Sequence, residues 1–168
     1  MSAAEAAALE LKNATQIAVK LDEARALPAS DVTGNLRVYD ELVRLAPNNM
    51  KYLEKRGHYE RMLAEQKRYA DDPELALELV NFTWQKGGFD NVQLVRFSVR
   101  NKAPFPIKDF ELTCVHQGPS GTDMDRNVRT VYELVPANGS KYVREVNMGF
   151  IAAQATSSRC DITDAVRA

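Results

Sequence analysis

Apolar and polar positions alternate along much of the second half of the chain. Between residues 92 and 115, the alternating apolar positions are Val95, Phe97, Val99, Phe110, Leu112 and Cys114. Successive side chains of a strand point to opposite faces, so this period of two predicts two strands, each buried on one face. Pro104 and Pro106 separate the strands because proline removes a backbone donor and interrupts a ladder. The residues predicted to share the core are Trp84, Phe97, Phe110 and Leu112.

Turn residues divide the rest of segment 73–168 into further short strands. The turn signals are Gly87-Gly88, Gly118-Pro119 and Asn138-Gly139. A break in the alternation near Val80 predicts a β-bulge in the first strand, and the last strand is predicted at 158–163. Six short strands with frequent turns favour an antiparallel β-sandwich.

The first 72 residues follow a helical period instead. Apolar residues three and four positions apart predict three helices, at 3–27, between Asp31 and Ala46, and from about Met50 to Tyr69. Ser30 or Asp31 can cap the second helix, because a side-chain oxygen there accepts a free N–H of the first turn. The period changes just after Pro73. The expected fold class is therefore segregated α+β, with a helical segment at 1–72 and a β domain at 73–168.

Composition narrows the classes of partner. The 168 residues are 45% hydrophobic and 27% charged, and the formal net charge is −1. The parts on either side of Pro73 are both close to neutral, so a nucleic-acid partner is not expected. No apolar run approaches the ~20 residues of a membrane-spanning helix. The first residues lack the charged and apolar regions of a signal peptide.

The two cysteines, Cys114 and Cys160, both fall in predicted strands and could be neighbours across the sandwich. Two alternatives are open. The cysteines form a disulfide in an oxidising compartment, or they are free thiols that pack as small hydrophobic side chains.

Catalytic signatures are missing from the sequence. Ser120 lies in a glycine-rich turn rather than in a nucleophile elbow, and the only histidines are His58 and His116. Cys114 and His116 are two apart and share a strand face, so with Asp161 they suggest a zinc site. A site of that kind needs more ligands than the pattern supplies. We therefore predict no catalytic residue, no metal and no cofactor, and keep a metal- or small-ligand-binding accessory domain as the alternative function.

Residues 92–163 resemble the FxLYD-type immunoglobulin-like domains of bacterial proteins. The resemblance is carried by Val99-Arg100-Asn101, Pro106-Ile107-Lys108-Asp109, Phe110-Glu111-Leu112 and the turn Leu134-Val135-Pro136-Ala137-Asn138-Gly139-Ser140. The chain departs from the family at Thr113-Cys114, where the family has Tyr-Asp. The resemblance implies an immunoglobulin-like sandwich without catalytic residues, in a protein often associated with the cell envelope. It favours a periplasmic or envelope location over a cytoplasmic one.

The helices around Pro47 resemble a single tetratricopeptide hairpin. The residues that carry this second resemblance are Leu36, Tyr39, Leu42, Leu45, Pro47-Asn48-Asn49, Tyr52 and Tyr59. One copy cannot build a solenoid, which needs about three repeats for a continuous core. The expected function is therefore a non-catalytic protein-interaction or structural module. Its partner is another protein, or a second copy that associates through the helical segment.

Overall fold

Helices and strands occupy separate parts of the chain, as the change of period predicts. The computed structural model describes residues 2–168, and the chain divides into a helical unit, Met1–Lys67, and a β unit, Arg68–Ala168. The division lies earlier than the expected boundary at 72/73 and falls inside the last helix. Tyr69 explains the difference, because its side chain is buried in the core of the β unit.

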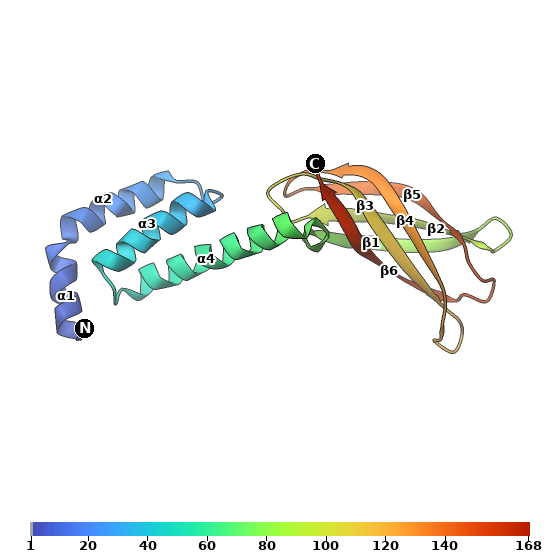
Figure 1. Cartoon of the computed structure of the whole chain (residues 1–168), viewed down its shortest axis with the longest axis horizontal. Helices are drawn as coiled ribbons and strands as arrows, with labels where there is room; N and C mark the ends of the chain where they lie inside the picture. The colour runs from blue at the N-terminus through green and yellow to red at the C-terminus, as the bar shows by residue number, and fades with distance from the viewer. Residues whose placement is uncertain (1) are drawn as a thin grey trace. The chain divides into compact units, whose positions relative to one another are not determined.

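The described part of the helical unit contains four helices rather than the three expected (Figure 1). They are α1 (Ala3–Lys12), α2 (Ala14–Ala26), α3 (Val32–Leu45) and α4 (Met50–Asp71). The prediction of one helix over 3–27 is wrong, because Asn13 leaves the helical conformation at ψ 7°. The Asn13 side chain donates a hydrogen bond to the carbonyl of Leu45, at 3.0 Å. This bond satisfies a carbonyl that the end of α3 would leave free.

The core of the helical unit lies where α2 packs on α3. Its buried members are Ile17, Val38, Leu42 and Ala46. At the start of α3, the Asp31 carboxylate accepts from the Gly34 N–H at 2.9 Å, so Asp31 is the cap of this helix. Asn35, one turn further on, is buried and donates to the carbonyls of Pro28 and Asp31. These bonds hold the loop between α2 and α3 against the helix that follows it.

The β unit contains six antiparallel strands in two three-stranded sheets (Figure 1). After a 3-10 turn at Pro73–Ala76, the strands are β1 (Leu77–Gly87), β2 (Val92–Asn101), β3 (Ile107–Gln117), β4 (Asp123–Val135), β5 (Ser140–Phe150) and β6 (Ser157–Arg167). The strand order is β1-β2-β5 in one sheet and β4-β3-β6 in the other. The last strand extends beyond the predicted 158–163.

The bulge predicted near Val80 is confirmed. The pairing of β1 with β2 changes register between Val80 and Thr83. Asn81, inside this irregularity, has a φ of 55°. Asparagine tolerates this left-handed conformation better than most residues. The bulge brings Phe82 and Trp84 back to the side of the core after the break in alternation.

Side chains from both sheets share one core. The rings of Phe97 on β2 and Phe110 on β3 meet edge to face, with centroids 6.2 Å apart. Both belong to central strands, and both are buried together with Leu112. The predicted core is confirmed for these three residues. Trp84 packs against the same cluster but is only partly buried, because β1 is an edge strand.

Candidate functional site

A disulfide joins Cys114 on β3 to Cys160 on β6 (loop separation 46 residues). The two cysteines are directly opposed in the register of these strands, with Cα atoms 4.0 Å apart. They are therefore neighbours within one sheet, and not across the two sheets as the sequence suggested. In antibody domains the conserved disulfide links the two opposite sheets. The Cys114–Cys160 bond differs, because it reinforces one strand pair, β3 with β6, within a single sheet.

A buried polar cluster lies next to the disulfide. His116, two residues after Cys114, is fully buried, and so is Gln93 of β2. The Gln93 side-chain amide donates to the Ser158 hydroxyl at 2.7 Å. Neither ring nitrogen of His116 has a hydrogen-bond partner within residues 2–168, and neither has Gln93 Oε1. Buried polar atoms are rarely left without a partner, so this cluster is the most unusual part of the core.

Burial controls the titration of His116. Removal from water lowers the pKa of His116 below its ordinary value of 6.5, and the negative charge of Asp125 opposes this change. Asp125 is opposite His116 in the register of β3 and β4, and its carboxylate accepts from the Ala152 N–H at 2.6 Å. The desolvation effect is the larger, so the imidazole is held in its neutral form.

The residues of the zinc alternative are not brought together. Cys114 and His116 face the core, as their spacing predicts, but Asp161 is opposite Thr113 and its side chain is exposed on the outer face. The sulfur of Cys114 is bonded to Cys160 and is not a free thiolate. Within residues 2–168, no group of three or more His, Cys, Asp or Glu side chains has the arrangement of a metal site.

The residues considered for hydrolysis, Ser120, His116 and His58, do not form a catalytic arrangement either. Ser120 is exposed in the β3–β4 turn, and its hydroxyl lies 3.0 Å from that of Thr122. His116 is buried among core side chains, where it cannot meet a solvent-exposed substrate group. His58 belongs to α4 and stacks edge to face on Tyr59. None of these contacts joins a nucleophile to a base.

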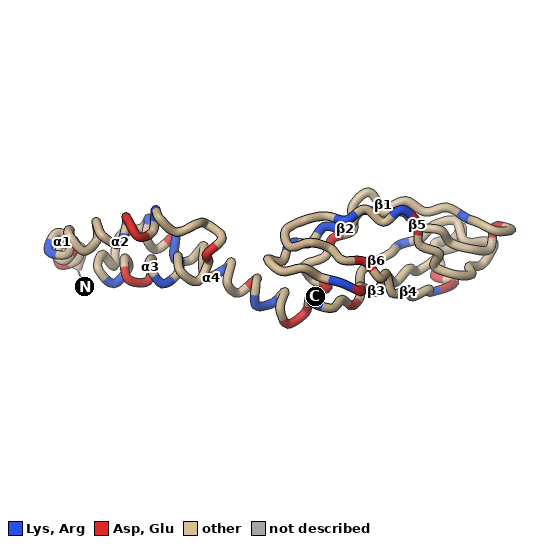
Figure 2. The backbone as a smooth tube through the Cα atoms, turned by 90° about the horizontal axis from the view of Figure 1, so that it is seen from above, with Lys and Arg blue, Asp and Glu red and all other residues tan. Residues whose placement is uncertain are grey.

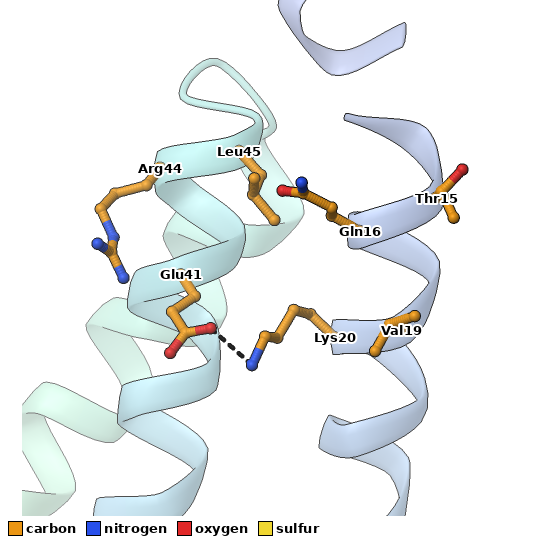
Figure 3. Close-up of a pocket in the computed structure, with 7 residues that line it drawn as sticks. All are labelled: Thr15, Gln16, Val19, Lys20, Glu41, Arg44 and Leu45. Carbon is orange, nitrogen blue, oxygen red and sulfur yellow. Dashed lines mark ion pairs between the residues drawn. The ribbon is translucent and has the colours of Figure 1, made fainter. Parts of the chain in front are cut away.

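The helical unit presents a hollow between α2 and α3 (Figure 3). Lys20 projects from α2 across this hollow to Glu41 of α3, with nitrogen and oxygen 2.6 Å apart, and it also binds Glu23 at 2.8 Å. Hydrogen bonds to Glu23 and Glu41 raise the pKa of the Lys20 ammonium above its ordinary 10.5. The Lys20–Glu41 ion pair places charged groups across this hollow. The hollow is therefore a poor binding surface for an apolar ligand.

A second groove, between α1 and α2, is apolar and open. We call it the α1–α2 groove, and its lining is Ala7, Glu10, Leu11, Ala14, Ile17, Ala18 and Leu21. The Leu11 side chain is 79% exposed. The three alanines leave room for the backbone of another helix to approach closely. The sequence pattern does not reveal this groove, because it predicts one helix over 3–27 where the chain has two.

Charge is distributed evenly around these features. Figure 2 shows lysines and arginines interspersed with acidic residues along both units. None of the helices within residues 2–168 combines the length and the apolar character that crossing a bilayer requires.

Comparison of the chain with protein-family models, with curated proteins and with solved structures gives no match. The function must therefore be argued from the residues and their geometry.

Proposed function

We propose that this chain is a non-catalytic protein-interaction module of a bacterial, envelope-associated protein. In this proposal the two sheets form an immunoglobulin-like sandwich of the FxLYD type, and the helical unit binds the partner. The shared core of Phe97 and Phe110 supports the sandwich, because it contains side chains from both sheets. The strand order also supports it, since hairpins within each sheet and crossovers between sheets are typical of such folds.

The α1–α2 groove is the observation that carries the proposal. An amphipathic helix binds by placing its apolar face in a hydrophobic groove. Leu11, at 79% exposure, is an uncovered apolar residue in the lining of such a surface. Ala14 and Ala18 add little bulk, so a partner helix can pack closely there. The occupant that fits is an amphipathic helix with small or aliphatic residues on one face.

The disulfide supports the envelope location. Disulfides persist in oxidising compartments such as the periplasm and are rare in the reducing cytosol. Cys114 is fully buried, so the bond is not an exposed, exchangeable thiol pair. Thiol counting on protein isolated without reductant from its native cells tests the location. Two free thiols would remove this support.

A photo-crosslinking amino acid at Leu11 tests the groove. The expected result is one crosslinked protein species that is lost when Ala14→Arg fills the groove. The matched control places the same probe at Thr33, on another helix of this unit. The captured protein must contain an amphipathic helix, and that helix as a synthetic peptide must bind the purified chain but not the A14R variant. A peptide that binds both forms equally would exclude the groove.

One observation favours a small-ligand accessory domain as a second candidate. His116 and Gln93 present buried ring and amide atoms without partners within residues 2–168. A small polar molecule beside them would satisfy these atoms. Nitrogen NMR of His116 during titration with zinc, and separately with small carboxylic acids, tests this candidate. Unchanged His116 signals throughout would exclude it.

A further inference from the structure

The four sheet edges of the β unit differ in how they are protected. β4 and β5 are edge strands of different sheets, and side chains of β4 bind the backbone of β5 and the loop after it. Asn127 donates to the Phe150 carbonyl at 2.9 Å, and Arg129 donates to the Asn147 carbonyl at 3.1 Å. Polar side chains directed across an edge discourage the addition of another strand. These bonds cover the β4–β5 side near Asn127 and Arg129, while a groove lined by Val131, Val143 and Val146 lies further along the two strands.

The edge of β6 is covered differently: the 3-10 turn at Pro73–Ala76 lies against this strand, and β1 contacts it. β6 pairs with β3 on one side, and no strand within residues 2–168 pairs with its other side. The Cα atoms of Cys114 and Cys160 are 4.0 Å apart, the close spacing of a non-hydrogen-bonded pair. In such a pair the backbone N–H and C=O point away from the neighbouring strand. Cys160 and, by the period of two, Ser158 and Ile162 therefore direct these groups to the open edge.

Incompletely covered apolar side chains lie along the same side. Cys160 and Ile162 of β6 are only partly buried, although they face the core. β1 contacts β6, and its core-facing Phe82 and Trp84 are partly buried as well. A strand added to β6 would satisfy the free backbone groups and cover these side chains at the same time. Two independent features of the unit thus point to the same edge.

We propose that β6 pairs antiparallel with β6 of a second copy of this chain, with Cys160 opposite its own counterpart. The two sheets then join into one continuous sheet across a two-fold axis, as an isologous interface requires. Ser158 of each copy lies opposite Ile162 of the other. Ser158, Cys160 and Ile162 all direct their backbone N–H and C=O groups to this edge. In this register these groups can therefore form hydrogen bonds with the same three residues of the other copy.

Charge complementarity selects this register. In it, Arg159 of each copy lies directly opposite Asp161 of the other. Both side chains are exposed on the outer face, at 68% and 72%, and within one copy they form an ion pair with nitrogen and oxygen 3.8 Å apart. The backbone pattern permits register shifts of two residues. One such shift sets Arg159 opposite Arg159 of the second copy, and the other sets Asp161 opposite Asp161. Like charges directly opposite each other destabilise a strand pair, so both alternatives are disfavoured.

Charge reversal tests the proposal on the full chain by light scattering and sedimentation. R159D and D161R each convert two attractive cross-strand pairs into repulsive ones, so each should weaken the dimer by about tenfold at low salt. The double variant R159D/D161R restores both attractive pairs and should recover wild-type affinity. An equimolar mixture of R159D with D161R should form a heterodimer that neither variant forms with itself.

Two matched controls separate this interface from the helical groove. R144D reverses an exposed arginine on β5 and should leave the dimer unchanged. L11R blocks the α1–α2 groove and should also leave it unchanged, while abolishing the binding of a partner helix. The proposal does not depend on the proposed function, since loss of groove binding leaves the β6 dimer intact.

Three outcomes would overturn the inference. The first is a wild-type chain that stays monomeric at millimolar concentration. The second is a dimer that L11R dissociates and R159D does not, which would assign self-association to the helices. The third is failure of R159D/D161R to recover the affinity that the single variants lose, although thermal unfolding of all three variants matches the wild type.

Discussion

The Asn101 side chain connects two loop segments of the β unit. Its side chain is 1% exposed, and its amide donates to the carbonyls of Phe105, at 2.8 Å, and Pro136, at 3.2 Å. Its side-chain oxygen accepts from the Ala103 N–H at 2.8 Å. Asn101 thus connects the proline loop after β2 to the turn between β4 and β5. The bonds to the Phe105 carbonyl and from the Ala103 N–H satisfy two backbone groups that burial would otherwise leave unpaired.

We expect Asn101→Ala to lower the free energy of unfolding by about 3 kcal/mol, because the buried Ala103 N–H and Phe105 carbonyl both lose their partner. Urea denaturation followed by the fluorescence of Trp84 measures the change. Ser120→Ala, at an exposed turn position of the same unit, is the control and should cost less than about 0.5 kcal/mol. A loss below about 1 kcal/mol for Asn101→Ala would show that the loops hold together without this side chain.

The buried imidazole of His116 should make stability fall on acidification. The folded-state pKa of His116 is lower than its ordinary 6.5, so the unfolded chain binds the proton more readily. Stability contributed by neutral His116 is therefore complete above pH 6.5 and is lost as pH falls from there through the folded-state pKa. Denaturant midpoints measured at intervals from neutral to acidic pH report this loss.

His116→Leu removes the titrating group and two unpaired ring nitrogens from the core. The variant should be at least as stable as the wild type at neutral pH, because it removes two buried ring nitrogens that lack a partner within residues 2–168. Its stability should decline less on acidification. His58→Gln, at an exposed position, should keep the wild-type decline. A His116→Leu variant with the wild-type pH profile would assign the decline to other groups.

Sequence patterns identified the apolar core but not the polar residues inside it. Alternation placed Phe97, Phe110 and Leu112 on one side of their strands, and burial follows from that placement. Asn101 and Gln93 carry no such signal, because a polar residue in a strand normally faces water. Their burial depends on partners distant in the sequence, such as the carbonyl of Pro136 and the hydroxyl of Ser158. Local sequence patterns do not reveal contacts between residues that are far apart in the sequence.

At the scale of elements, β3 and β6 are linked by hydrogen bonds and by one covalent bond. The disulfide closes a loop with a separation of 46 residues, which includes β4 and β5. Removing it by Cys114→Ala/Cys160→Ala should lower the free energy of unfolding by ~4 kcal/mol in the chain-entropy view. Denaturation curves of wild type and variant measure the difference.

Reductant provides the internal control for this prediction. It should destabilise the wild type to the level of the double variant and should leave the double variant unchanged. A wild type equally stable with and without reductant, once thiol counting shows full reduction, would mean that β6 is held by its ladder and core contacts alone.

Helix ends were harder to predict than strands. The region 3–27 has high helix propensity throughout, and propensity alone favours one continuous helix. The break at Asn13 arises from tertiary structure, because the Asn13 side chain reaches the Leu45 carbonyl on another helix. The α1–α2 groove is lined by residues from both sides of this break. Its shape therefore depends on the break, which local sequence patterns do not predict.

At the scale of the whole molecule, the chain has two hydrophobic cores with no common member. One is centred on Val38 and Leu42, and the other on Phe97 and Phe110. The only tryptophan, Trp84, packs on the second core. Its fluorescence therefore reports the β unit, and helical circular dichroism reports mainly the first unit. The two probes should give separate unfolding transitions if each core melts independently.

Substitutions in each core should move one transition and leave the other in place. Phe110→Ala should lower the stability of the β unit by ~3–5 kcal/mol and shift only the fluorescence transition. Leu42→Ala should lower that of the helical unit by ~2–5 kcal/mol and shift only the dichroism transition. Thermal or urea denaturation with both probes on the same samples measures the shifts. Coincident curves that move together in both variants would show that the two cores unfold as one cooperative unit.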